Sequence, residues 1–374
     1  MKIINGTVFS NDFHFHKRNL YTEGASITAS SVSDMVYDAS NCYVIPGLVD
    51  IHFHGAMGHD FCDGTKEAFD AIASFEVSHG VTSICPATMT LSSERLISIC
   101  KAAKTFSENT SEMKSSFVGI HLEGPFLSYE KRGAQNPEYL RNPSIEEIHT
   151  LMNCSGGLIK LLSIAPELPG SMEAISALKS QMVLSLAHTT ADYQTACEAF
   201  EMGASHVTHL YNAMMPFSHR APGVIGAAFD HHADVELICD GIHVDPCVVR
   251  STFQLFSKEH VILISDSMEA CGMPDGNYAL GGQAVSVKGP LATLSDGTIA
   301  GSASTLFSCM KNAISMGISP EIAIQAATYN PAKSIGIENH VGTLEPSMDA
   351  DLLILNQDFS LCDVIHHGVL LPRI

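Results

Sequence analysis

The chain has 374 residues, 45% of them hydrophobic, and its 20 basic and 40 acidic side chains give a formal net charge of −20. That charge argues against nucleic acid or an anionic membrane as a partner. No apolar run approaches the ~18 residues of a membrane span, and the N-terminus shows no apolar signal core. The 11 cysteines include no C-x-x-C pair, so we expect reduced thiols and a cytoplasmic protein.

The two ends of the chain have a similar pattern. Residues 1–46 contain the strand-like segments MKIINGTVFS and NCYVIP, separated by polar, serine-rich turns. Residues 337–374 contain apolar segments of the same kind, in DADLLILN and HHGVLLPRI. Two strand-rich ends that flank a larger unit can pair, so we expect them to form one small β-sandwich domain.

The central residues 47–336 show short apolar runs with helix-like segments between them. The segment 66–80 is an example, since its apolar residues follow helical spacing and it ends in glycine. Strands alternating with helices predict an α/β fold, here a (β/α)₈ barrel of the TIM type, with an open doubly wound sheet as the alternative. The expected strands are 47–54, 81–88, 116–123, 159–167, 182–189, 206–212, 235–241 and 261–267.

Polar side chains able to bind a metal stand at the carboxyl ends of several of these strands. In (β/α)₈ enzymes that rim carries the active site. Imidazole and carboxylate ligands without thiolate favour Zn²⁺ or Fe²⁺, with Mn²⁺ or Co²⁺ as substitutes, and this many ligands would hold two divalent ions. The residues are His52, His54, Glu123, His188, His209 and Asp266.

The stretch VDIHFHG places His52 and His54 two residues apart. On a strand, both imidazoles would therefore point to the same face. Glu123 lies between two groups of histidines and would bridge the two ions. Asp266 would ligate a metal, accept a proton from bound water, or do both.

The other closely spaced histidines are interpreted as structural. His14 and His16 share the same spacing but have no strand-end partner in the barrel pattern. His121 faces the same way as Glu123, which indicates a packed or supporting role. The adjacent pairs 231–232 and 366–367 would point opposite ways on a strand, so we expect surface residues there.

Longer motifs then point to a family. The chain contains PGLVDIHFHG, GIHLEGPF, KRGAQNP, LAHTTA, VTHLYNAM, HRAPGVIG, CDGIHV, ISDSM, DGTIAGSAS and GTLEPSMDADLLIL. Over essentially its full length it resembles the N-acetylglucosamine-6-phosphate deacetylases of the amidohydrolase superfamily. HLEGPF and THLYNAM are specific to that family, whereas HxH and DADLLIL indicate only the superfamily.

The resemblance implies a homodimeric, metal-dependent hydrolase that removes acetate from N-acetylglucosamine 6-phosphate. It implies that Glu123, His188 and His209 are metal ligands and that Asp266 is the catalytic acid/base. Arg220 would be supplied to the neighbouring subunit's site. The positions that would hold the phosphate or the sugar are Gln135, Asn212, Ala213, Arg220, His243, Ile299, Ala300 and Gly301.

Two positions distinguish this chain within the family pattern. Some branches lack the HxH pair and bind one metal, so His52 and His54 favour the two-metal form. Gln135 stands where the better-known branch has a histidine that contacts the substrate. A glutamine can still hydrogen-bond a hydroxyl or carbonyl, but it cannot titrate.

The expected chemistry is hydrolysis of an amide. A divalent ion lowers the pKa of its bound water to ~7 and polarises the acetamide carbonyl. Asp266 would take the water's proton and give it to the departing amine, which leaves poorly unless protonated. Two alternatives are the same chemistry on another substrate, such as N-acetylgalactosamine 6-phosphate or a cyclic amide, and a non-catalytic metal-binding protein on the same fold.

Overall fold

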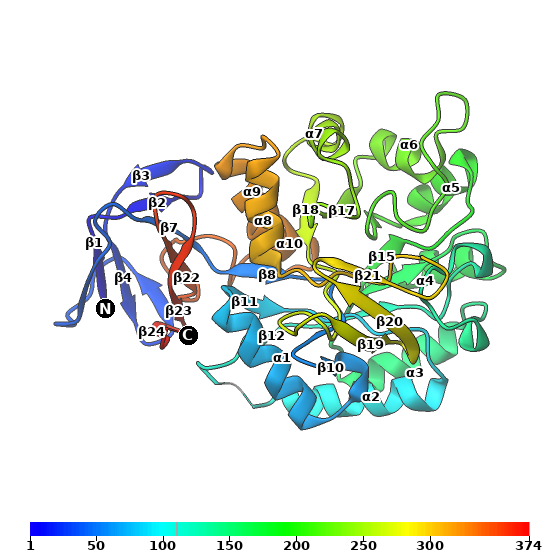
Figure 1. Ribbon diagram of the computed structural model, residues 1–374, viewed down its shortest axis with the longest axis horizontal. Coiled ribbons are helices and arrows are strands. Elements are labelled where there is room, and N and C mark those ends of the chain that lie inside the picture. The colour runs from blue at the N-terminus through cyan, green and yellow to red at the C-terminus, as the bar shows by residue number, and fades with distance from the viewer. Residues whose placement is uncertain (110, 374) are drawn as a thin grey trace.

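The computed structural model describes residues 1–109 and 111–373. Figure 1 shows the strands of both chain ends together on one side and the larger α/β part on the other. Across the described ranges, no helix has the length and apolar character needed to cross a membrane. All 11 cysteines are free thiols.

The larger part is built on parallel strands that are buried on both faces. Their sequences are continuous apolar runs such as VILI and IKLLSI, as is usual for parallel strands covered by helices. They form two sheets, in the orders β12-β11-β8 and β13-β14-β15-β16-β17-β18. The strands are β8 (Leu48–Asp50), β11 (Val81–Ile84), β12 (Ser116–Phe117), β13 (Ile120–Glu123), β14 (Ile159–Ile164), β15 (Val183–Leu186), β16 (His206–Val207), β17 (Asp234–Ile238) and β18 (Val261–Ile264).

Backbone hydrogen bonds join these two sheets at both edges. The N–H of Thr88 donates to the carbonyl of His121 (2.9 Å), which links the second strand to the third. The N–H of Asp266 donates to the carbonyl of His52 (3.0 Å), which links the last strand to the first. The strands therefore close on themselves, and the expected (β/α)₈ barrel is confirmed.

Helices follow the strands in the order that a (β/α)₈ barrel requires. Most begin at a side chain that caps the first turn, as Thr65, Ser92 and Asp192 do for α1, α2 and α5. The helices are α1 (Lys66–Ser78), α2 (Ser93–Ser107), α3 (Ile145–Ser155), α4 (Ser171–Leu178), α5 (Tyr193–Met202), α6 (Gly223–Asp230), α7 (Pro246–Leu255), α8 (Leu306–Ser315), α9 (Pro320–Ala327) and α10 (Tyr329–Ser334).

The two chain ends share a sheet. The C-terminal strands β22 (Leu352–Leu355), β23 (Leu361–His366) and β24 (Val369–Leu370) continue into β7 (Tyr43–Pro46), β2 (Thr7–Phe9) and β3 (Phe15–Lys17). A second sheet contains β5 (Ser26–Thr28), β4 (Leu20–Glu23), β1 (Lys2–Ile4) and β6 (Val36–Asp38). Both sheets contribute to one apolar cluster that includes Ile3, Leu20, Ile27, Val8, Val44, Leu352 and Ile365.

Several predicted elements differ in detail. The expected strand 47–54 ends at Asp50, so His52 and His54 lie in the loop beyond β8. The third strand is divided into β12 and β13, and the sixth is only two residues long. The serine-rich stretch between the first predicted strands, read as turns, contains β3 to β6.

An insertion between β18 and α8 has no counterpart in the predicted barrel pattern. It is an antiparallel sheet of β19 (Gly276–Leu280), β20 (Gln283–Lys288) and β21 (Leu291–Thr293). Figure 1 shows this sheet, drawn in yellow, against the α/β part. Its short segments alternate polar and apolar residues, which is typical of a half-exposed hairpin rather than of a barrel strand.

Candidate active site

The predicted ligand residues meet beyond the carboxyl ends of the barrel strands. Glu123 is the last residue of β13, whereas His188, His209 and Asp266 follow their strands in the left-handed region, with φ of 43°, 31° and 49°. Non-glycine residues held there store of order 1–3 kcal/mol each, and such residues gather at functional sites. The strands thus end in turns that aim polar side chains at one point.

The carboxylate of Glu123 is the centre of this arrangement. Its Oε1 lies 3.2 Å from Nε2 of His188 and 3.1 Å from Nε2 of His209. Its Oε2 lies 3.4 Å from Nε2 of His54, and Nε2 of His52 is 3.6 Å from Oε1. Two candidate metal-binding groups therefore share Glu123, one with His52 and His54 and one with His188 and His209.

The donor atoms of this cluster fit divalent metal ions. The Nε2 atoms of His188 and His209 lie 3.0 Å apart, and both point at the same carboxylate. Nε2 of His52 is buried and has no hydrogen-bond partner among the described residues. Imidazole nitrogens and carboxylate oxygens without thiolate suit Zn²⁺, Fe²⁺ and similar ions. The cluster therefore has the donor set of a divalent-metal site.

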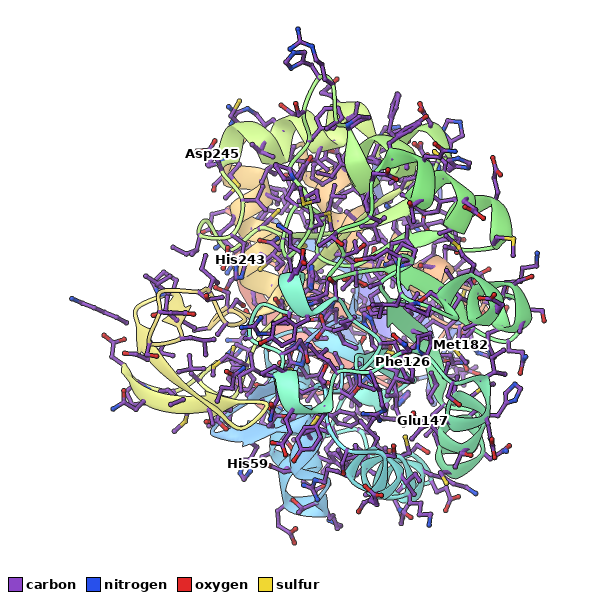
Figure 2. All side chains as sticks on the ribbon, turned by 90° about the vertical axis from the view of Figure 1, so that its right-hand side faces the viewer. His59, Phe126, Glu147, Met182, His243 and Asp245 are labelled. Atoms are coloured by element: carbon purple, nitrogen blue, oxygen red, sulfur yellow. The ribbon has the colours of Figure 1, made fainter. Side chains whose placement is uncertain are left out.

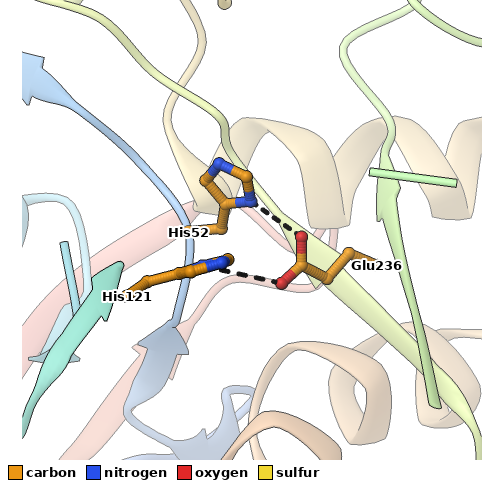
Figure 3. Close-up of side chains that lie close together, drawn as sticks. All are labelled: His52, His121 and Glu236. Atoms are coloured by element: carbon orange, nitrogen blue, oxygen red, sulfur yellow. Dashed lines mark hydrogen bonds and ion pairs between the residues drawn. The ribbon is translucent and has the colours of Figure 1, made fainter. Parts of the chain in front are cut away.

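A buried acid supports the cluster from below. Nδ1 of His52 lies 2.7 Å from Oε2 of Glu236, and Figure 3 shows His121 beside His52, facing the other oxygen of the same carboxylate. Burial raises the pKa of Glu236, but His52 and His206 lower it well below its usual range, so the carboxylate stays charged. It therefore fixes the ring of His52 with Nε2 facing Glu123. The supporting role expected for His121 agrees with its complete burial.

Asp266 lies on the open side of the cluster. Its Oδ1 is 3.3 Å from Nε2 of His54 and 3.7 Å from Nε2 of His52. Burial raises the pKa of the Asp266 carboxyl, but the hydrogen bond with His54 and the charge of His52 bring it below the usual range. The Asp266 carboxyl group is thus ionised at neutral pH.

A pocket of about 450 Å³ opens above Glu123. Most of the residues predicted to contact substrate or metal line it, but three do not: Ala300 and His52 are completely buried, and Arg220 lies outside the pocket. The predicted residues in the wall are His54, Glu123, Gln135, His188, His209, Asn212, Ala213, His243, Asp266, Ile299 and Gly301.

Some lining residues were missed from the sequence. Lys131 and Arg132 line the pocket and bring positive charge to a chain of net charge −20. They precede Gln135 in the KRGAQNP motif. A basic pair that follows a predicted strand could therefore have indicated these two residues as part of the site. Asp296 and Thr298 belong to the DGTIAGSAS motif, which was their signal, whereas Leu280 comes from the unpredicted insertion and had none.

Gln135 is tied to the cluster. Its Nε2 donates to Oε2 of Glu123 (2.8 Å), and its Oε1 accepts from the N–H of Thr90 (2.7 Å). The amide orientation is fixed because each end has a partner of only one type. Gln135 therefore holds the central carboxylate as well as facing the pocket.

Arg220 does not reach this pocket within its own chain. It is exposed in the loop between β16 and α6, where Ser218 and Ala221 form an isolated bridge. The same loop exposes the apolar side chains of Met215 (41%) and Phe217 (54%). His243, labelled in Figure 2, does line the pocket, and its Nδ1 is 2.7 Å from Oδ2 of Asp240.

Comparisons with known proteins define the class. The model of the amidohydrolase family matches residues 43–371, and the chain therefore belongs to the amidohydrolase family. Within it, the chain belongs with the N-acetylglucosamine-6-phosphate deacetylases. The enzyme of that name from Bacillus subtilis is 39% identical over 327 residues, which cover 86% of this chain and 82% of that protein.

Two further relatives bear on the site. A structure of a Mycobacterium smegmatis N-acetyl-D-glucosamine-6-phosphate deacetylase variant, in complex with N-acetyl-D-glucosamine-6-phosphate, superposes with a TM-score of 0.93 at 29% identity. The match covers 99% of this chain and 98% of that one. An N-acetylgalactosamine-6-phosphate deacetylase from Escherichia coli O157:H7 is 33% identical over 330 residues, covering 87% of this chain and 86% of that protein.

Proposed function

We propose that this chain hydrolyses N-acetylglucosamine 6-phosphate to glucosamine 6-phosphate and acetate. The observation that carries the proposal is the Glu123 cluster, which combines two candidate metal groups with an ionised Asp266 at the floor of one pocket. The names and full-length similarity of the relatives give the substrate class. A non-catalytic barrel would need neither the two candidate metal groups together nor the ionised Asp266 beside them.

We propose two divalent ions per chain, Zn²⁺ or Fe²⁺. His52 and His54 would hold one, His188 and His209 the other, and Glu123 would bridge them. A divalent ion in such a site lowers the pKa of bound water to ~7 and polarises a carbonyl oxygen.

The chain's own residues would then move the proton. Oδ1 of Asp266 is placed to take a proton from the attacking water, because it is ionised and faces the same histidines. The carboxyl group would return that proton to the amine nitrogen, which leaves only when protonated. Asp266 thus acts first as a base and then as an acid.

Binding of the sugar phosphate would use the polar wall of the pocket. Asn212, Ala213, His243 and the backbone around Ile299–Gly301 lie on that wall. We propose that the chain is a homodimer and that Arg220 contacts the phosphate in the partner's site. Its exposure, and the exposed apolar side chains beside it, support a contact with another chain.

The finer organisation of the chain is proposed in the same way. We place a β-sandwich domain at residues 1–46 and 337–374, with the metal-dependent barrel at 47–336, because the two terminal sheets share one apolar cluster. We also place the enzyme in the cytoplasm, which suits its 11 free thiols.

Acetate release from metal-loaded enzyme tests the function. We expect turnover of N-acetylglucosamine 6-phosphate and slower turnover of N-acetylgalactosamine 6-phosphate. A preference for the galacto epimer would establish the activity of the Escherichia coli relative instead. Failure to release acetate from either sugar, with folded and fully loaded protein, would contradict the proposal.

A further inference from the structure

A second histidine–carboxylate cluster lies far from Glu123 in the sequence. Asp351 directly precedes β22, and His366 is the last residue of β23, which pairs with β22. His367 follows with φ of 48°, and the two imidazole rings lie with centroids 4.0 Å apart. The expectation that these adjacent histidines point opposite ways at the surface is wrong, because the strand ends at His366, which is completely buried.

The three side chains bring their donor atoms together. Nδ1 of His366 lies 2.9 Å from Oδ1 of Asp351, and Nδ1 of His367 lies 3.9 Å from the same oxygen. Neighbouring ligands around a tetrahedral zinc ion, with bonds of about 2.0–2.2 Å, are roughly 3.4 Å apart. The two observed distances lie on either side of that value.

The hydrogen bonds of His366 indicate a positive charge between it and Asp351. Its Nε2 lies 2.9 Å from the backbone carbonyl of Lys114, which can only accept, so Nε2 carries a hydrogen. A neutral ring of this tautomer then turns the lone pair of Nδ1 toward a carboxylate oxygen. A proton or a metal ion must lie between them.

The carboxylate of Asp351 supplies an independent observation. Its Oδ1 accepts the backbone N–H of His367 (2.7 Å), but its buried Oδ2 has no hydrogen-bond partner among the described residues. A carboxylate that is only 4% exposed loses much solvation, and an unpartnered anionic oxygen there is costly.

We propose that Asp351, His366 and His367 bind a structural divalent transition-metal ion of the zinc type. The donor set, two imidazoles and one carboxylate, is one that zinc uses. A cavity of about 70 Å³, lined by His367 and Ser116, lies beside this cluster. This junction site, as we call it, is separate from the active site.

The position of the junction site gives the ion a physical role. His366 contacts the carbonyl of Lys114, and Nε2 of His367 lies 3.0 Å from the hydroxyl of Ser116, the first residue of the barrel strand β12. The ligands themselves belong to the C-terminal strands. An ion there would hold the C-terminal strands in the orientation that packs against the barrel.

Metal analysis of three variants tests the proposal. Wild type, His367→Ala, Ser116→Ala and His231→Ala are dialysed against the same buffered zinc concentration and analysed for zinc per chain. His367→Ala should contain one ion fewer than wild type, with its kcat unchanged. Ser116→Ala removes only the hydrogen bond to His367, and His231→Ala alters an exposed adjacent-histidine pair, so both should keep the wild-type metal content.

Equal zinc in wild type and His367→Ala would overturn the proposal and leave a protonated His366 paired with Asp351. If His367→Ala does not fold, His367→Gln serves instead, because it retains similar volume and a hydrogen bond to Ser116. Loss of one ion in His231→Ala as well as in the His367 variants would also contradict direct ligation by His367. Kcat reports separately on the active-site ions, so the two sites are distinguished.

Discussion

The active site and the junction site are built from the same kinds of side chain, but they have different roles. Around Glu123, the donors come from the carboxyl ends of parallel strands and face a pocket of about 450 Å³. Around Asp351, they come from one antiparallel pair, and the cavity beside them, of about 70 Å³, is lined by His367 and not by His366 or Asp351. Catalytic metal sites keep a position open to substrate, whereas structural sites are closed. Access to the metal, rather than ligand type, separates the two.

The second difference is an extra carboxylate. Asp266 lies beside the active-site histidines, where its ionised form can move a proton. The junction site has Asp349 nearby, but the raised pKa of that carboxyl favours its protonated form compared with an ordinary aspartate. We therefore expect chemistry at the first site only.

Replacement of Asp266 and of Asp351 should distinguish the two sites most strongly, because only the first change should lower kcat. Asp266→Asn should lower kcat by about 10²- to 10⁴-fold, the range for loss of a general acid–base group, with the fold intact. Asp351→Asn should leave kcat nearly unchanged in protein that folds. Steady-state kinetics at full metal loading measure both. Near-normal turnover by Asp266→Asn would remove that residue from the mechanism.

Replacement of Arg220 tests whether a second subunit contributes a phosphate contact to the active-site pocket. Charge-assisted hydrogen bonds to phosphate contribute about 1.5–3 kcal/mol, so Arg220→Ala should lower kcat/KM for the phosphorylated sugar by about 10- to 100-fold. A non-phosphorylated analogue should be used almost as well as by wild type. Equal effects on both substrates would contradict a phosphate contact.

Mixed dimers show which subunit the arginine serves. Chains carrying Arg220→Ala and chains carrying Asp266→Ala are unfolded together and refolded as random pairs. Half of the dimers are then mixed, and each mixed dimer has one site with both groups intact, so about a quarter of wild-type activity should return. No recovery, with mixed dimers confirmed by mass, would place Arg220 in its own subunit's site or outside any site.

Loss of metal should have different consequences in the two regions. His52→Asn combined with His54→Asn should remove one ion and lower kcat, because these residues hold one of the two groups that share Glu123. His367→Ala should also remove one ion without changing kcat. Parallel metal analysis and kinetics distinguish them. An active site with full metal content after loss of both histidines would contradict the two-ion assignment.

Much of the active site followed from the sequence because strand ends in a (β/α)₈ barrel converge. Glu123, His188, His209 and Asp266 could be placed on one rim by counting strands. The exact directions of their side chains could not be predicted, because they depend on left-handed φ values at His188, His209 and Asp266. These conformations come from tertiary packing and leave no mark in the residue type.

The junction site escaped prediction for a related reason. Alternation along a strand separates His366 from His367, but the chain turns at His367, where φ is 48°. The insertion of β19 to β21 was missed because its alternating pattern lies outside the apolar barrel strands. Sequence reasoning succeeded where one periodic rule holds throughout an element and failed for the backbone conformation of the residues that end it.

The smallest expected effect concerns the charge that the pocket presents to phosphate. Burial lowers the pKa of His243, but the hydrogen bond to Asp240 and the charge of Asp240 raise it above its usual range. His243 therefore keeps its positive charge to a higher pH when folded than when unfolded. That charge, and the binding it supports, is lost as the pH rises through the folded pKa. Asp240→Asn should lower this pKa.

With Asp240→Asn, KM for the phosphorylated sugar should begin to rise at a lower pH than in wild type. Between the two folded pKa values, KM should be about fivefold higher, the equivalent of about 1 kcal/mol for one partly screened charge. The kcat should change little, because Asp240 has no contact with Glu123 or Asp266 among its hydrogen bonds. His243→Asn serves as the reference, since it should abolish the pH dependence of KM in this range. An unshifted KM profile in Asp240→Asn would show that the charge of His243 does not contribute to phosphate binding.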